Sequence, residues 1–186
     1  MSLKTGPMSA RRTLLGAIAS SPLWFGPAWA ASQSMKISHQ FPGGSVMEGD
    51  FRDRLCRMFA ADVEKRTRGS LKFSIYPNAS LMAPNAQFSA LKKGGLDLAL
   101  VPLSYAAAES PEANIGLMPG LVTSYAQGYG WKNAEVGKEL TRILAEQGLV
   151  VVSWIWQAGG VASRGAPILA PEDARGMKVR GGSREM

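Results

Sequence analysis

Leu96-Asp-Leu-Ala-Leu-Val101 is the stretch that decides the fold, because it is an almost uninterrupted apolar run of strand length. Gly94 and Gly95 precede it and Pro102 ends it. A short apolar run between such breakers is typical of a strand that is buried on both faces, as in a parallel sheet covered by helices. We therefore expect an α/β fold.

The neighbouring segments alternate between strand and helix patterns. Leu71, Phe73 and Ile75 alternate with polar residues, which predicts a half-buried strand. Helices are expected at 47–68, around Phe88 and Leu91, and at 133–147. Further strands are expected at Met35–His39, Leu149–Trp156, near Val161–Ser163 and at Met177–Arg180. Such alternation predicts mostly parallel sheets flanked by helices, which place ligands at the carboxyl ends of their strands.

Residues 1–30 have the three parts of a secretory signal. Their basic residues are Lys4, Arg11 and Arg12. A mostly apolar stretch at 13–25 is too short to span a bilayer, and Ala28-Trp-Ala30 offers the small residues that signal peptidase reads. We expect cleavage after Ala30 and a periplasmic protein, exported by the general or the twin-arginine route. No later segment reaches about 18 uninterrupted apolar residues, so we expect no membrane-embedded part.

Net charge and cysteine content further limit the functional classes to which the protein can belong. The formal charge is +7, of which the expected signal supplies three, so the remainder carries +4. The remaining basic residues are scattered among acidic ones, which makes a nucleic-acid partner unexpected and leaves a mild preference for anions. The single cysteine, Cys56, cannot form an internal disulfide. We expect Cys56 to be an inert residue in the core or at its boundary.

The stretch Pro171-Glu-Asp-Ala-Arg-Gly-Met-Lys-Val-Arg180 carries the clearest binding pattern. A turn leads into a short strand, and Gly181 and Gly182 then let a ligand approach the backbone closely. A guanidinium at a strand end offers a planar fork of donors that matches a carboxylate. Two interpretations follow from the residues alone. Arg180 is the carboxylate anchor of an exported solute receptor, or it is a solvated strand residue.

The sequence contains no catalytic constellation. The only histidine is His39, which excludes a site built from several histidines. No serine lies in a Gly-x-Ser-x-Gly turn, and no Gly-Gly pair fits a phosphate-binding loop. We therefore expect no cofactor, no metal and no enzymatic activity, and an exported α/β enzyme is the weaker alternative.

Taken in order, these segments resemble the DctP-type family, the periplasmic solute receptors of tripartite ATP-independent periplasmic (TRAP) transporters. The resemblance rests on Leu71-Lys-Phe-Ser-Ile-Tyr-Pro-Asn-Ala-Ser-Leu81, Leu91-Lys-Lys-Gly-Gly-Leu-Asp-Leu-Ala-Leu100, Val136-Gly-Lys-Glu-Leu140 and Pro171–Arg180. It implies a two-lobed fold that closes on a small organic acid and delivers it to a TRAP membrane permease. A receptor that presents its ligand to a sensor kinase is the alternative.

The resemblance also implies site residues. Arg180 matches the family arginine that pairs with the ligand carboxylate. The other positions that line the family's pocket are His39, Gln40, Ser104, Trp156 and Gln157. Several members carry a second arginine where this chain has Gln157-Ala-Gly-Gly-Val161, so we expect a monocarboxylate or a larger, partly apolar acid. Trp154 and Trp156 share one face of their expected strand, which favours a core position over a stacking platform.

The expected organisation follows from the same resemblance. It comprises a signal peptide at 1–30, a first α/β lobe at 31–155, and a crossover with the start of a second lobe at 156–186. The last expected strand comes just before the end of the sequence. We therefore expect a longer protein, in which the second lobe is completed.

Overall fold

The computed structural model describes residues 32–182, so the predicted signal peptide lies outside the described residues. In chain order the elements are β1 (Gln33–His39), α1 (Phe51–Arg66), β2 (Leu71–Tyr76), η1 (Pro84–Ala86), α2 (Gln87–Lys92), β3 (Leu98–Leu100), η2 (Leu103–Ala106), η3 (Pro111–Leu117), α3 (Tyr125–Gly130), η4 (Trp131–Asn133), α4 (Glu135–Glu146) and η5 (Pro171–Ala174), where η marks a 3₁₀ helix. None of the helices in this part of the chain has the length and apolar character needed to cross a bilayer.

The three strands form one parallel sheet in the order β2-β1-β3. β1 pairs with β2 from Gln33↔Leu71 to Ser38↔Tyr76, and with β3 from Ile37↔Leu98 to His39↔Leu100. The predicted α/β class with a parallel sheet is therefore confirmed. The expectation that the Leu96–Val101 strand is buried on both faces was wrong, because β3 lies at the edge of the sheet and its three residues are only half-buried.

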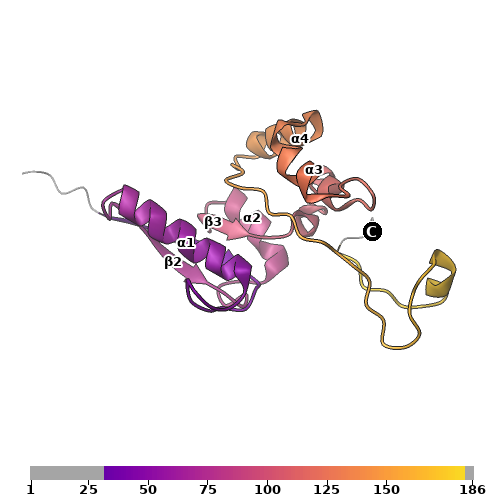
Figure 1. Ribbon diagram of the computed structural model, residues 1–186. Helices are drawn as coiled ribbons and strands as arrows, with labels where there is room; N and C mark the ends of the chain where they lie inside the picture. The colour runs from indigo at the N-terminus through magenta and orange to yellow at the C-terminus, as the bar shows by residue number, and fades with distance from the viewer. Residues whose placement is uncertain (1–31, 183–186) are drawn as a thin grey trace, which may run out of the picture. The chain divides into compact units, whose positions relative to one another are not determined.

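Helix α1 packs on this sheet and builds a small core (Figure 1). Its buried residues are Ile37 from β1 and Cys56 and Ala60 from the helix. The helix begins at Phe51 rather than Met47, because the side chain of Asp50 accepts a hydrogen bond from the Arg52 amide and caps the first turn. Burial raises the pKa of the Cys56 thiol to about 11, which agrees with the expectation of an inert thiol.

A second core forms where α2 meets the helices between β3 and the C-terminal segment. Its buried residues are Phe88, Ala106, Ala113, Trp131, Leu140 and Leu144. Leu149 and Val151 pack against it, whereas Val150 and Val152 are 85% and 63% exposed. The segment after α4 thus presents alternate residues to the core, as its sequence pattern predicts.

The predicted strands at 149–156, 161–163 and 177–180 are absent from the described structure. A strand exists only where its backbone pairs with a neighbour, and no strand of residues 32–182 lies beside these segments. In Figure 1 the chain beyond α4 accordingly runs without strand arrows. The lobe boundary proposed near residue 155 stays a prediction.

Trp156 is held in the second core by a glycine on α3. Its ring lies 5.2 Å from that of Trp131, in an edge-to-face arrangement. A Cβ atom built on Gly128 would lie 2.6 Å from Cγ of Trp156. Gly128 is therefore required by the approach of the indole, since any side chain there would overlap the ring.

We predict that Gly128→Ala lowers the free energy of unfolding by about 1–3 kcal/mol, because the added methyl overpacks against Trp156. Denaturant titration measures this change. Gly130→Ala, at the end of the same helix, is the matched control, because a Cβ atom there meets nothing within 4 Å. The control should leave the free energy of unfolding unchanged or raise it slightly. An equal decrease in both variants would contradict the conclusion that Trp156 packs directly against Gly128.

Candidate functional site

The loops that follow β1 and β3 leave the sheet at the same edge, because the two strands are parallel neighbours. We call this the carboxyl edge and define it by residues 40–50 and 101–106. The turn after β2 joins it, since the amides of Asn78 and Ala79 donate to the carbonyls of Phe41 and His39, each at 2.9 Å. Edges of this kind are where open α/β sheets bind ligands.

A buried carboxylate holds the carboxyl edge together. Asp53, in the first turn of α1, is fully buried. Its Oδ2 accepts from Nε of Arg57 at 2.7 Å and from the Gly44 amide at 2.9 Å, and its Oδ1 lies 3.1 Å from Nε2 of His39. One side chain therefore connects the end of β1, the loop that follows it, and α1.

The charges in this network are set by burial and hydrogen bonding. Burial opposes ionisation of Asp53, but the hydrogen bonds from Arg57 and Gly44 outweigh it and hold the pKa of Asp53 below its ordinary value. Burial lowers the pKa of His39, against the opposing effect of the Asp53 carboxylate. At neutral pH His39 is therefore uncharged, and its Nε2–H donates to Asp53.

His39 thus has a different position from the one predicted for a ligand contact. Its side chain is fully buried and its accessible donor is used by Asp53. In this structure His39 supports the loop and has no surface to offer to a solute. The next residue, Gln40, is half-buried at the start of the loop and remains at the carboxyl edge.

The structure brings Gln157 to the carboxyl edge through an arginine that sequence reasoning missed. Nη1 of Arg52 donates to Oε1 of Gln157 at 3.3 Å, although the two residues are 105 positions apart. Asp50 accepts from Nε and Nη2 of the same guanidinium, at 2.8 and 2.6 Å. The guanidinium carbon lies 3.8 Å from the centre of the Phe41 ring. Arg52 is therefore fixed and largely neutralised before any solute arrives.

Arg180 reaches the carboxyl edge from the C-terminal segment. Its Nη2 donates to the hydroxyl of Tyr105 at 3.1 Å. Tyr105 follows Ser104, a predicted site residue that is itself buried on η2. The structure thus places Arg180 beside the loop after β3, whereas the side chain of Trp156 packs into the second core, as its strand pattern favours.

Signals for the missed residues exist in the sequence. Asp50, directly before a helical pattern, is a standard N-cap, and Arg52 and Asp53 belong to the turn that it starts. Tyr105 follows the expected end of a strand, where ligand contacts are usual. No local pattern, however, indicates which of these residues would meet Gln157 or Arg180.

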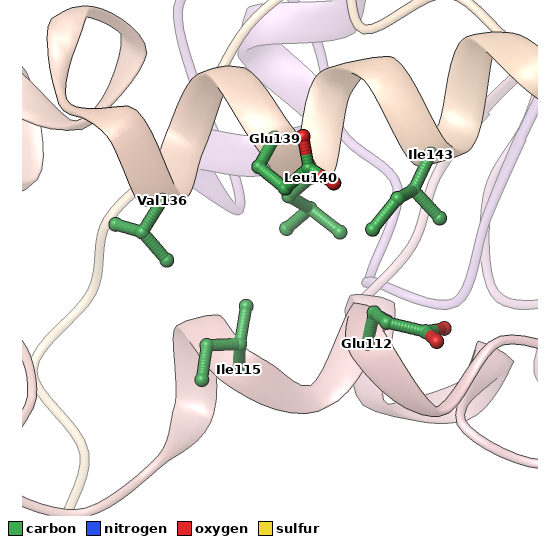
Figure 2. Close-up of a pocket in the computed structure, with 6 residues that line it drawn as sticks. All are labelled: Glu112, Ile115, Val136, Glu139, Leu140 and Ile143. Atoms are coloured by element: carbon green, nitrogen blue, oxygen red, sulfur yellow. The ribbon is translucent and has the colours of Figure 1, made fainter.

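A separate hollow lies between η3 and α4. Figure 2 shows Val136, Glu139, Leu140 and Ile143 of α4 opposite Glu112 and Ile115 of η3. The cavity measures about 220 Å³ and its walls are mostly apolar. Hydrogen bonds from Arg142 lower the pKa of Glu139, so that this side chain is charged at neutral pH. Two carboxylates at its rim make this hollow unsuited to an organic anion.

Within residues 32–182 there is no group of three or more His, Cys, Asp or Glu side chains that could hold a metal ion.

The family model and the relatives found by comparison with known proteins point to the same family. The model of the family described as bacterial extracellular solute-binding protein, family 7 (DctP), matches residues 44–186. A solute-binding protein of Albidiferax ferrireducens is 65% identical over 179 residues, which cover 95% of this chain and 53% of that protein. The chain spans about half the length of the curated relatives that it matches.

Two solved structures support the same assignment. A TRAP periplasmic solute-binding protein from Rhodoferax ferrireducens, with bound malonate, is 70% identical with a TM-score of 0.78. The match covers 81% of this chain and 48% of that one. A TRAP protein from Sulfurospirillum deleyianum, with bound succinate, is 26% identical with a TM-score of 0.66, over 78% of this chain and 46% of that one.

We predict that stability decreases as the pH falls from about 7 to about 5, by up to about 1.4 kcal/mol per pH unit. His39 stays neutral in the folded state because its pKa is lowered. In the unfolded state it takes up a proton below about pH 6.5, which favours unfolding. Denaturant titration at several pH values measures the slope. His39→Gln keeps an amide donor for Asp53 without titrating, and should flatten the curve. An identical slope in the variant would contradict the assignment.

Proposed function

Because the chain belongs to family 7 of the bacterial extracellular solute-binding proteins (DctP), we propose that it is a receptor that captures a small organic acid anion and delivers it to a TRAP-type membrane permease. The malonate and succinate bound to its structural relatives are both dicarboxylates. They favour a small dicarboxylate over the monocarboxylate or larger acid that the missing second arginine had indicated.

The observation that carries this proposal is the state of Arg180. Two of the arginines on α1 that contact the carboxyl edge are paired with acids, Arg52 with Asp50 and Arg57 with Asp53, and a third, Arg54, donates to the backbone carbonyl of Val46. Arg180 is exposed and its hydrogen bond goes to a neutral phenol, which leaves its charge uncompensated by that contact. A guanidinium of this kind is a suitable partner for a carboxylate of the solute.

The remaining site residues divide into two groups. Gln40, Ser104 and Gln157 belong to segments at the carboxyl edge and are proposed to line the solute site. His39 and Trp156 are proposed to act through the structure, His39 by holding the loop and Trp156 by anchoring the segment before Gln157 to the second core. Binding then relies on closure around an ion pair and involves no chemical step.

The proposed function also implies where the mature protein is located in the cell. The basic and apolar pattern of residues 1–30 is typical of an export signal, and the relatives with bound malonate and succinate are described as periplasmic. We propose that the mature receptor works in the periplasm with the permease as its partner.

We predict that Arg180→Ala weakens malonate binding by about 2–5 kcal/mol in the intact protein, because a desolvated carboxylate loses its partner. Arg180→Lys should also weaken it, since an ammonium cannot reproduce the fork. Isothermal titration calorimetry measures both. Arg66→Ala is the control, because this exposed arginine ends α1, just before β2 begins and so away from the carboxyl edge. An Arg180→Ala variant that binds within about twofold of the wild type would reject the anchor.

We predict that the exported protein begins at Ala31, because Ala28 and Ala30 occupy the positions that signal peptidase reads. N-terminal sequencing of protein from the periplasmic fraction tests this. Replacing Ala30 with Lys provides the control and should leave an uncleaved precursor. Recovery of the intact residues 1–30 in a stable membrane fraction would refute the cleavage site.

A further inference from the structure

We propose that Tyr105 is a positioning residue, which orients the Arg180 guanidinium and leaves one of its two forked edges for the solute carboxylate. This inference rests on the proposed function, because it assigns a further determinant to the same site. The Tyr105–Arg180 hydrogen bond, at 3.1 Å, joins residues that are 75 positions apart.

Tyr105 is the rigid member of this pair. It lies in the middle of η2, between Ser104 and Ala106, which are only 4% and 2% exposed. Its amide donates to the carbonyl of Pro102 at 3.0 Å, and the Ala107 amide closes the next turn on Ser104. With buried neighbours on both sides, the backbone that carries the phenol is held in place.

Arg180 is the adaptable member. It is exposed and lies in a segment without helix or strand after η5. A free arginine side chain has many accessible rotamers, and part of this freedom is lost whenever its head group is fixed. A hydrogen bond to a rigid phenol removes some of that freedom before binding, so less is lost when the solute arrives.

The identity of the bonded atom decides what remains for the solute. A guanidinium has five N–H groups and two edges that present parallel donors, one formed by Nε and Nη2 and the other by Nη1 and Nη2. Nη2 contributes one hydrogen to each edge. Because the Tyr105 oxygen accepts from Nη2, it occupies one of these hydrogens and obstructs that edge. The other edge stays complete for a bidentate carboxylate.

This arrangement selects for ligand geometry as well as charge. A planar carboxylate matches the remaining edge with two parallel hydrogen bonds, and its approach direction is fixed by the phenol. A lysine in place of Arg180 has no such edges, so the phenol would have nothing comparable to orient. The contribution of the Tyr105 hydroxyl should therefore depend on the guanidinium.

Calorimetry with malonate on the intact protein tests this dependence. Tyr105→Phe, which removes only the hydroxyl, should weaken binding by about 3- to 10-fold. In an Arg180→Lys background the same change should alter binding by less than about twofold. Tyr129→Phe removes a hydroxyl from an exposed tyrosine on α3 and should leave binding unchanged.

Side-chain ¹⁵N relaxation of Arg180 Nε in the ligand-free protein separates this inference from the proposed function. The resonance is assigned by its loss in Arg180→Lys, and Tyr105→Phe should increase its mobility. Unchanged mobility, or equal losses of affinity in both Arg180 backgrounds, would overturn the positioning role. Failure of the wild type to bind malonate, succinate or any other small carboxylate would instead overturn the receptor function, whatever the relaxation shows.

Discussion

The buried carboxylate of Asp53 connects three parts of the chain that are separate in sequence, and the carboxyl edge depends on it. His39 ends the central strand, Gly44 belongs to the loop that follows, and Arg57 lies one turn further along α1. Leaving a buried charge without its partners costs about 3–5 kcal/mol, so losing these contacts would strongly destabilise the junction between the three parts. The loop that begins at Gln40 is thereby fixed against the sheet before any solute is present.

The proposed receptor combines a fixed edge with an adaptable C-terminal segment. The loops after β1 and β3 are held by the Asp53 network and by the buried residues of η2. Gln157 and Arg180 come from the segment beyond α4, whose described residues form no strand. Each of the two residues contacts the edge through a single hydrogen bond. Such contacts are weak enough to rearrange around a solute. A receptor that closes on its ligand needs this combination of a rigid platform and a movable partner.

Sequence patterns predicted the elements well where a single element buries its own face. The alternation of Leu71, Phe73 and Ile75 and the helical spacing in α4 describe faces that pack locally, and the structure confirms both elements. It also confirms α1 as a helix, although the buried face of α1 carries Cys56 and Ala60 and most of its larger apolar residues are exposed. The patterns were less reliable for an element that forms only when a neighbouring strand pairs with it. The 149–156 segment shows the alternation of a strand and buries one side of it, yet no strand of the described chain pairs with it.

The sequence by itself therefore determined the α/β class and the order of the elements from β1 to α4, because these depend on local composition and spacing. The export signal and the role of Arg180 stay predictions from the sequence. Only the tertiary structure decided that His39 supports the loop and that Arg52 and Tyr105 meet Gln157 and Arg180. These pairings join residues as many as 105 positions apart. Periodicity describes which side of an element is buried, whereas the partner of a polar side chain depends on how the loops return to the sheet.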